Sequence, residues 1–380
     1  MNDPYSTSWH RDKTLFTPGP LTTSLSVKHA MLHDAGSWHY EFHKIVKSIQ
    51  ARLLTIAGVT REKDGFEVVL LQGSGTFGVE SVFASAVPSD GKVLVLSNGA
   101  YGERMIAMLK LMKIDHAVYR TAEHEPPAAS EVDNILAGDP AITHVAAVHC
   151  ETTTGILNPI HEIGQVVHQH KRHYIVDAMS SFGALPINFQ EGCIDYLISS
   201  PNKCLEGVPG FTYVLLRRAL LEANRGHQRS LSLDLLHQME YFDAKTQFRY
   251  TPPTHTLLAF HQALNEFDEE GGLAGRENRY RRNHAVLMEE MANLGIRPYL
   301  DPALQSPIIT SFHFPDDPAF DFTKFYMGLS DQGMIIYPGK LTETECFRIG
   351  NIGRIFEHDI RQLALAIRRT LTDMGVSLKS

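Results

Sequence analysis

Between residues 66 and 216, short apolar runs rich in β-branched residues alternate with stretches of helical periodicity. Strands separated by helices form mostly parallel sheets with covered faces. Nearly uninterrupted apolar runs, such as VVLL and VLVL, suit strands that are buried on both faces. The sequence therefore predicts an α/β domain with a mostly parallel, seven-stranded sheet. The expected strands are residues 67–71, 92–96, 116–119, 144–148, 173–176, 196–199 and 211–216.

The pattern changes near residue 255, where longer helical stretches begin. The segment THTLLAFHQALNEFDEEGG predicts a connecting helix that ends at a glycine pair. A smaller α/β domain is expected to follow it, with strands over 307–314, 334–337 and 346–349, a helix over 322–332 and a final helix. We therefore expect three parts. They are an N-terminal arm that contributes to the small domain and the site (1–25), a large domain (26–255), and the connecting helix with the small domain (256–380).

Composition limits the partners that the chain can have. Its 380 residues carry a net charge of −8 and contain no block of Lys or Arg, so neither nucleic acid nor an anionic membrane is an expected partner. The four cysteines are widely spaced, which indicates neither a metal site nor a disulfide framework. No apolar stretch is long enough to span a membrane, and the first twenty residues lack the apolar core of a signal peptide. We expect a cytoplasmic protein that acts on small molecules.

A glycine-rich loop follows the first predicted strand and precedes a helical pattern. It reads Gln72-Gly73-Ser74-Gly75-Thr76-Phe77-Gly78. Small residues let backbone N–H groups approach an anion, and the N-terminus of the following helix favours negative charge. The loop therefore predicts a phosphate site.

The same loop matches GxGxxG, so a nicotinamide dinucleotide site is an alternative. A dinucleotide site uses an acidic residue near the end of the next strand to hold the ribose hydroxyls. Here that strand runs into Ser97-Asn98-Gly99, without an acid. The sequence therefore favours a single phosphate over a dinucleotide, and an NAD-dependent oxidoreductase is the remote alternative.

An acid and a lysine follow two neighbouring predicted strands. Asp177 ends the strand YIV, and Lys203 comes shortly after YLIS. A pyridoxal ring needs a carboxylate beside its pyridine nitrogen and an amine that condenses with its aldehyde. Either residue alone could be an ordinary helix cap or a solvated side chain. Together with the phosphate loop, the pair predicts a pyridoxal 5'-phosphate (PLP) site.

At this point the chain resembles a known family over nearly its whole length. It is similar to the class V aminotransferases, which are PLP enzymes of fold type I, and in particular to those that transfer the amino group of 2-aminoethylphosphonate to pyruvate. The VDA and NK pieces are common to the class, whereas NKC, GVPGF, RSLSLDL and CFRIGNIG resemble the aminophosphonate family. The matching segments are TPGPLTTS, LLQGSGTFGVE, LSNGAYGERM, HCETTTGILNPI, YIVDAMSSFGALP, YLISSPNKCLEGVPGF, RSLSLDL, SPIITSF and CFRIGNIG.

The resemblance implies a role for each matching residue. Lys203 would be the Schiff-base lysine, Asp177 would pair with the pyridine nitrogen, and Thr152 would hydrogen-bond the ring hydroxyl. Tyr101 would stack on the ring. The phosphate would be held by Ser74, Gly75, Thr76 and Asn202 of one subunit and by Thr251 of the partner subunit, in a homodimer with its site at the interface.

The substrate side of the site is also implied by the resemblance. Arg348 would bind the acidic end of the substrate, because a guanidinium matches carboxylate or phosphonate oxygens, and Gly19 would also lie against the substrate. The products would be phosphonoacetaldehyde and L-alanine. Residues 36–43, GSWHYEFH, depart from the family pattern, which has an acid-rich stretch beside the tryptophan.

Other assignments remain open on the sequence alone. A related class V enzyme could use phosphonoalanine as donor, or alanine or serine with glyoxylate. A desulfurase would need a cysteine in a mobile glycine-rich loop, and we find none; Cys204, beside Lys203, is expected to be a packing residue. The histidines at 168, 170 and 173 lack the further ligands of a metal site.

Overall fold

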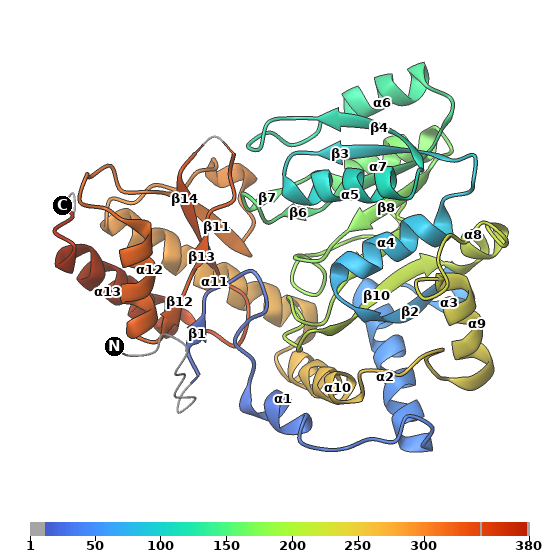
Figure 1. The fold of residues 1–380 in the computed structure, drawn as a ribbon, viewed down its shortest axis with the longest axis horizontal. Helices are drawn as coiled ribbons and strands as arrows, with labels where there is room; N and C mark the ends of the chain where they lie inside the picture. The colour runs from blue at the N-terminus through green and yellow to red at the C-terminus, as the bar shows by residue number, and fades with distance from the viewer. Residues whose placement is uncertain (1–11, 343, 378–380) are drawn as a thin grey trace.

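The large domain is built on the seven-stranded sheet in Figure 1, with strand order β2-β10-β9-β8-β5-β3-β4. The structure, a computed structural model, describes residues 12–342 and 344–377. Strand β10 is antiparallel to both of its neighbours, and the other four pairs are parallel. All seven predicted strands are confirmed. They are β2 (Phe66–Gly73), β3 (Lys92–Ser97), β4 (Asp115–Arg120), β5 (Ile142–Val148), β8 (His173–Asp177), β9 (Tyr196–Ser199) and β10 (Gly210–Arg217).

Helices cover this sheet because their apolar faces match its buried strands. Helix α4 packs on β2, β9 and β10, helix α5 on β3, β4 and β5, and helix α7 on β8. A short hairpin of β6 (Cys150–Glu151) and β7 (Ile156–Leu157) follows β5. The helices before α11 are α1 (Leu25–Ala30), α2 (Tyr40–Ala57), α3 (Arg61–Asp64), α4 (Gly75–Ala86), α5 (Ala100–Leu111), α6 (Ala129–Gly138), α7 (Ile160–Gln169), α8 (Arg218–Ala223), α9 (Leu235–Lys245) and α10 (Thr254–Glu269).

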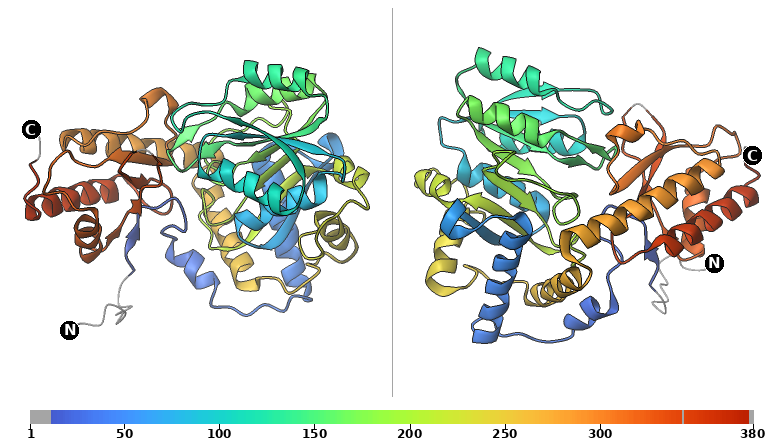
Figure 2. Two further views of the ribbon diagram at one scale, coloured as in Figure 1. Left: turned by 45° about the horizontal axis from the view of Figure 1, so that its top comes forward. Right: turned by 180° about the vertical axis from the view of Figure 1, so that it is seen from behind.

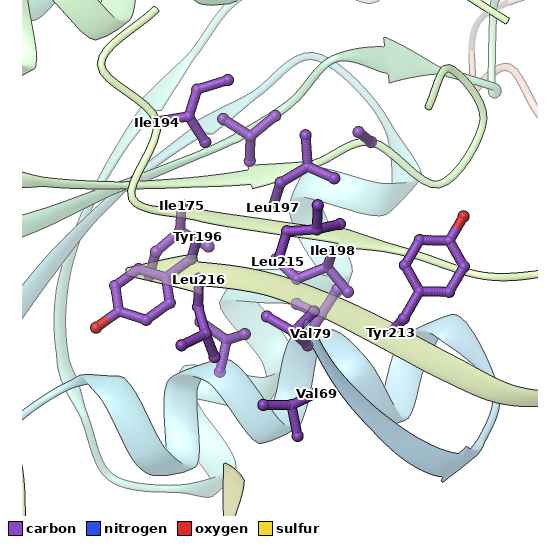
Figure 3. Packing of buried hydrophobic residues seen from close by; sticks show 14 of the residues in the cluster. Val69, Val79, Ile175, Ile194, Tyr196, Leu197, Ile198, Tyr213, Leu215 and Leu216 are labelled. Atoms are coloured by element: carbon purple, nitrogen blue, oxygen red, sulfur yellow. The ribbon is translucent and has the colours of Figure 1, made fainter. Parts of the chain in front are cut away.

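The core of the large domain lies between these layers. Figure 3 shows Val79 of α4 close to Val69 of β2, Ile198 of β9 and Leu215 of β10. Each of these side chains is at most 4% exposed. Burying one such side chain stabilises a fold by roughly 1.5–3 kcal/mol. The packing fixes the strand ends on which the candidate site residues lie.

The small domain has a separate core. Its sheet, in the order β11-β14-β13, is antiparallel, and Phe312 and Phe347 stack within its core. Asp321 starts α12 by accepting a hydrogen bond from the amide of Lys324. The elements are a 3₁₀ turn (Pro302–Leu304), β11 (Ile309–His313), α12 (Phe322–Asp331), β12 (Met334–Ile335), β13 (Tyr337–Pro338), β14 (Cys346–Gly350) and α13 (Glu357–Asp373).

Helix α11 (Gly272–Asn293) joins the two domains, as the right-hand view of Figure 2 shows. The boundary expected after residue 255 differs from this packing. The apolar residues of α10, including Phe260 and Phe267, belong to the core of the large domain. Val286 and Met291 of α11 belong to the core of the small domain. The segment expected to connect the domains therefore packs in the large domain, and the long helix after it makes the connection.

The N-terminal arm crosses from the small domain to the large one. Strand β1 (Thr14–Leu15) pairs in parallel with β12, and Phe16 lies in the core of the small domain. The expected arm also included residues 1–11, which lie outside the described residues. In the part of the chain that the structure describes, no helix is long and apolar enough to cross a membrane.

Candidate active site

A cavity of about 510 Å³ lies where the strands β8 and β9 end. This is the edge at which ligands bind in open parallel sheets. Gly19, Thr251 and Arg348 are not among the residues that line the cavity. The predicted site residues that do line it are Ser74, Gly75, Thr76, Tyr101, Thr152, Asp177, Asn202 and Lys203.

Lys203 lies in the turn after β9 and points its ammonium at the N-terminal arm. Its Nζ donates to the carbonyl of Pro18 at 2.6 Å and to that of Gly19 at 3.4 Å. Burial lowers the pKa of Lys203 to about 8, and the Arg348 guanidinium contributes to the lowering. A lysine with this pKa is partly uncharged near neutral pH, so its amine can act as a nucleophile or accept a proton.

Gly19 takes part in the site through its backbone. Its φ of +99° lies in the region that favours glycine. A Cβ here would lie 2.7 Å from Cδ of Lys203 and 2.6 Å from the carbonyl oxygen of Asn202. Glycine therefore lets the arm approach Lys203 closely. This places the residue against the lysine, and its expected contact with substrate stays a prediction.

Asp177 ends β8, which pairs in parallel with β9. Asp177 is 5% exposed, and its carboxyl group accepts a hydrogen bond of 2.9 Å from the amide of Met179. Burial raises the pKa of Asp177 to about 6, with an addition from the nearby Glu151 and opposition from Lys203. A cation placed beside this carboxylate would stabilise its charged form. The protonated nitrogen of a pyridine ring is such a cation.

The phosphate loop joins β2 to the N-terminus of α4. Ser74 occupies the N-cap position without a side-chain capping bond, so the first N–H groups of the helix face the loop. A side chain at Gly75 would collide with the sulfur of Met179. Gly78 lets α4 pack close to the sheet, because a Cβ there would lie 2.8 Å from Cγ2 of Ile198. The small residues therefore shape both the cradle and its support.

Tyr101 lies in the first turn of α5, and a buried acid accepts a hydrogen bond from its amide. Its amide donates to Oε2 of Glu151 at 3.2 Å. Glu151 is fully buried, and its other oxygen accepts bonds from the amide and hydroxyl of Thr153 at 3.0 and 2.6 Å. Two cations lie over the phenol ring of Tyr101. The guanidinium of Arg104 is 4.8 Å from the ring centroid and the ammonium of Lys340 is 4.9 Å from it. The predicted stacking on a cofactor ring remains a prediction.

Thr152 and Arg348 meet between the domains. Arg348 lies on β14, is 3% exposed, and donates from Nη1 to the carbonyl of Thr152 at 2.6 Å. Its Nε donates to the carbonyl of Pro338 at 3.0 Å. Burial lowers the pKa of Arg348. Two of its nitrogens are therefore engaged by backbone oxygens, so its predicted bond to substrate would use the remaining donors or require these bonds to exchange.

Thr251 lies outside the cavity, in the exposed segment before α10. Its carbonyl accepts a hydrogen bond of 3.0 Å from Nε2 of Gln72, the first residue of the glycine-rich loop. The exposed side chains of Phe77 and Tyr250 lie on the same two segments. Apolar side chains that are exposed together can mark an interaction surface.

Arg104 and Met179 are among the residues that line the cavity and that sequence reasoning missed. Arg104 donates to the hydroxyl of Thr76 at 3.2 Å, so it links α5 to the phosphate loop. A signal for Arg104 was present, because it follows Tyr101 by three residues on a helix and shares its face. Met179 carried no comparable signal, since its place follows from the turn after β8.

Cys204 and His170 have ordinary structural partners. Cys204 is fully buried, its thiol donates to the carbonyl of Ser180 at 3.3 Å, and burial raises its pKa. His170 pairs with Asp133 at 2.6 Å. Within residues 12–342 and 344–377, no group of three or more His, Cys, Asp or Glu could hold a metal ion.

Comparison with known proteins adds a family and several relatives. The family model described as aminotransferase class-V matches residues 22–344. A 2-aminoethylphosphonate–pyruvate transaminase from Klebsiella pneumoniae is 50% identical over 359 residues, which cover 94% of this chain and 97% of the relative. One from Pseudomonas fluorescens is 48% identical over 362 residues, covering 95% and 97%.

Solved structures share the fold at lower identity. Ureidoglycine-glyoxylate aminotransferase from Bacillus subtilis superposes with a TM-score of 0.88 at 21% identity, covering 97% of this chain and 95% of that one. Pyridoxamine-pyruvate aminotransferase from Mesorhizobium loti gives 0.87 at 23% identity, covering 98% and 95%. These neighbours confirm the predicted fold type I architecture.

Proposed function

The chain belongs to the class V aminotransferases, and from that membership we propose that it transfers the amino group of 2-aminoethylphosphonate to pyruvate. The products are phosphonoacetaldehyde and L-alanine, so the reaction exchanges an amine and a ketone without a net oxidant. It is a step in phosphonate catabolism. The names of the relatives at about 50% identity support this substrate pair. The observation that carries the proposal is the placement of Lys203, Asp177 and the phosphate loop around one cavity.

PLP is the cofactor of this class, and when bound it supplies an electrophilic carbon and a ring that stabilises negative charge at the reacting carbon. The cavity has residues suited to each part of it. The N-terminus of α4 with Ser74, Gly75 and Thr76 suits the phosphate. Asp177 would pair with the pyridine nitrogen, and Thr152 would hydrogen-bond the ring hydroxyl. Asn202 would add a further polar contact to the phosphate.

Lys203 carries the proton transfers in this proposal. With a pKa of about 8, about a tenth of its side chains are uncharged at pH 7. The uncharged Nζ would bind the aldehyde carbon of the cofactor. Once a donor amine has taken its place, Nζ would accept the proton of the donor carbon and deliver it to that aldehyde carbon, so that the amino group stays on the cofactor. The carbonyls of Pro18 and Gly19 hold the ammonium that results. Asp177, as a carboxylate beside the ring nitrogen, would keep that nitrogen protonated.

The acidic end of the donor would bind beside positively charged side chains. Arg348 is our proposed ligand for the phosphonate, with Gly19 beside the reacting carbon. Arg104, which lines the cavity, and Lys340 both lie over the ring of Tyr101 and add positive charge beside it. A phosphonate with up to two negative charges is stabilised by such a group of cations more than a carboxylate is.

The proposed assembly is a homodimer in the cytoplasm. Thr251 of the partner subunit would complete the phosphate site, and the exposed Phe77 and Tyr250 beside the loop support a contact with a second chain. The four cysteines, all unpaired, are typical of a reducing compartment.

The test is an alanine-production assay with pyruvate and a panel of amines. We expect kcat/KM to be highest for 2-aminoethylphosphonate. Phosphonoalanine and β-alanine test the phosphonate and the position of the amine, and alanine or serine with glyoxylate tests the related class V activities. A preference for one of the latter pairs would reject the proposed substrate while leaving the aminotransferase activity.

A further inference from the structure

The turn that carries Lys203 is held from behind by a buried acid. Glu206, the third residue after Lys203, is 3% exposed, and its amide donates to the carbonyl of Lys203 at 2.8 Å. Its φ of +57° is uncommon for a residue with a side chain. A backbone conformation of this kind persists only when surrounding contacts hold it. The contacts of Glu206 therefore bear on the position of the lysine.

Those contacts come from α11, the helix that joins the domains (Figure 2). Oε1 of Glu206 accepts bonds from Nη2 of Arg279 at 2.7 Å and from the hydroxyl of Tyr280 at 2.5 Å. Arg276 forms an ion pair with the same oxygen at 3.6 Å and donates to the carbonyl of Cys204, next to the lysine. The turn is thus bound to α11 at two of its four residues.

The charges of this cluster balance. Glu270, at the end of α10, accepts from Nε of Arg276 at 2.8 Å and from Nε of Arg279 at 2.7 Å. The cluster therefore has two arginines and two glutamates. Removing one member of a buried set of paired charges leaves the others uncompensated, which is costly. The side chain of Glu206 is held in one place for that reason.

The same helix side chains also hold the small domain. Nη1 of Arg279 donates to the carbonyl of Gly353 at 2.6 Å, and the hydroxyl of Tyr280 accepts from the amide of Gly353 at 3.1 Å. The next residue, Arg354, donates from its amide to the carbonyl of Thr22 in the N-terminal arm at 2.7 Å. That arm supplies the carbonyls that bind Nζ of Lys203. The backbone of the lysine turn and the arm that binds Nζ of Lys203 are therefore both linked to α11.

We propose that Glu206 is a positioning residue for Lys203, acting through Arg279 and Tyr280 to set where the amine meets the aldehyde of the cofactor. The proposal rests on the proposed function, in which Lys203 binds the cofactor covalently. It assigns Glu206 no contact with substrate or cofactor. Small displacements of a reacting group have large effects on the bond it forms, so loss of this anchor weakens the lysine bond and leaves the phosphate cradle unchanged.

The test compares two cofactor forms on the cofactor-free protein. PLP binds through its phosphate and through Lys203, whereas pyridoxamine 5'-phosphate has no aldehyde and binds without the lysine. We expect Glu206→Ala to weaken PLP binding by about tenfold and Glu206→Gln, which keeps an acceptor oxygen, by less. Affinity for pyridoxamine 5'-phosphate should stay within about twofold of the wild type.

Glu290→Gln is the matched control, because Glu290 lies on the same helix in a pair with Arg361 at 3.0 Å, away from the lysine turn. It should leave both affinities unchanged. Equal losses for the two cofactor forms, or no loss for either, would overturn the role of Glu206. If Glu206→Ala does not fold, Glu206→Gln decides between the same outcomes. If Lys203→Ala binds PLP as tightly as the wild-type protein does, the proposed function is overturned, and this inference with it.

Discussion

The ammonium of Lys203 donates a hydrogen bond of 2.6 Å to the carbonyl of Pro18, which lies 185 residues earlier in the chain. The arm that contains Pro18 is attached to the small domain through the pairing of β1 with β12. The lysine belongs to the large domain. The protonated amine is therefore held by a group that belongs to the other domain, and small-domain movement can alter its surroundings.

The lowered pKa of Lys203 predicts a reactive amine at moderate pH. Burial makes the charged form less stable, so the uncharged amine forms as the pH rises through about 8. In the cofactor-free protein, acylation of Lys203 should reach its plateau about two pH units earlier than that of an ordinary lysine. Competitive labelling followed by peptide mass spectrometry measures this. Lys92 is the internal control, because its hydrogen bond to Asp139 raises its pKa, and equal profiles for the two lysines would contradict the prediction.

The buried carboxyl of Asp177 predicts opposite effects of Asp177→Asn on stability and turnover. The pKa of Asp177 in the folded protein, about 6, exceeds the ordinary value of 3.8. As the pH rises between these two values, the free energy of unfolding of the cofactor-free protein therefore falls, by about 3 kcal/mol in total. The variant should melt at or above the wild-type temperature at pH 7. Its kcat should fall by about 10²-fold or more, since the ring loses its charged partner. A variant with normal kcat would show that Asp177 has no electrostatic role.

Gly75→Ala should weaken cofactor binding, because the new Cβ collides with Met179. We expect the affinity for pyridoxamine 5'-phosphate to fall by about tenfold or more. Met179→Ala in the same chain should restore part of it by removing the colliding sulfur. Gly138→Ala is the control, since nothing lies within 4 Å of a Cβ there. The steric explanation fails if the double variant binds no better than Gly75→Ala alone.

A phosphate site shared between subunits predicts complementation. Lys203→Ala and Thr251→Ala fall in the same site of a mixed dimer only if Thr251 of the partner subunit acts across the interface. One of the two sites in the hybrid then has both natural residues. Random mixing at limiting cofactor should give about a quarter of wild-type activity, above the sum of the parents. Activity no higher than the unmixed variants would place Thr251 within its own subunit.

The fold was predictable where the residue pattern is local. The seven strands of the large sheet were found because uninterrupted apolar runs such as residues 68–71 leave few alternatives to buried strands. The boundary between the domains was not predictable. Helices α10 and α11 are both long and have apolar faces, and periodicity does not show which core each face packs in. Only packing distinguishes Phe260, in the large core, from Met291, in the small one.

The site was predictable where residues follow strand ends. Asp177 ends β8 and Lys203 follows the end of β9, its parallel neighbour, so the topology brings the two residues to the same edge of the sheet. The partners of Arg348 could not be foreseen, since the carbonyls of Thr152 and Pro338 belong to segments far from it in sequence. The same holds for the contact of Gly19 with Lys203, because a glycine in a turn has no side-chain chemistry to indicate its neighbour.

The central claim is that Lys203 is the residue that binds PLP. Reduction of the PLP-loaded protein with borohydride makes that bond permanent, and peptide mass spectrometry then locates it. We predict one phosphopyridoxyl group per chain, on the peptide that contains Lys203, and none on that peptide in Lys203→Ala. A label on another lysine of the wild-type protein, or no stable label, would contradict the assignment.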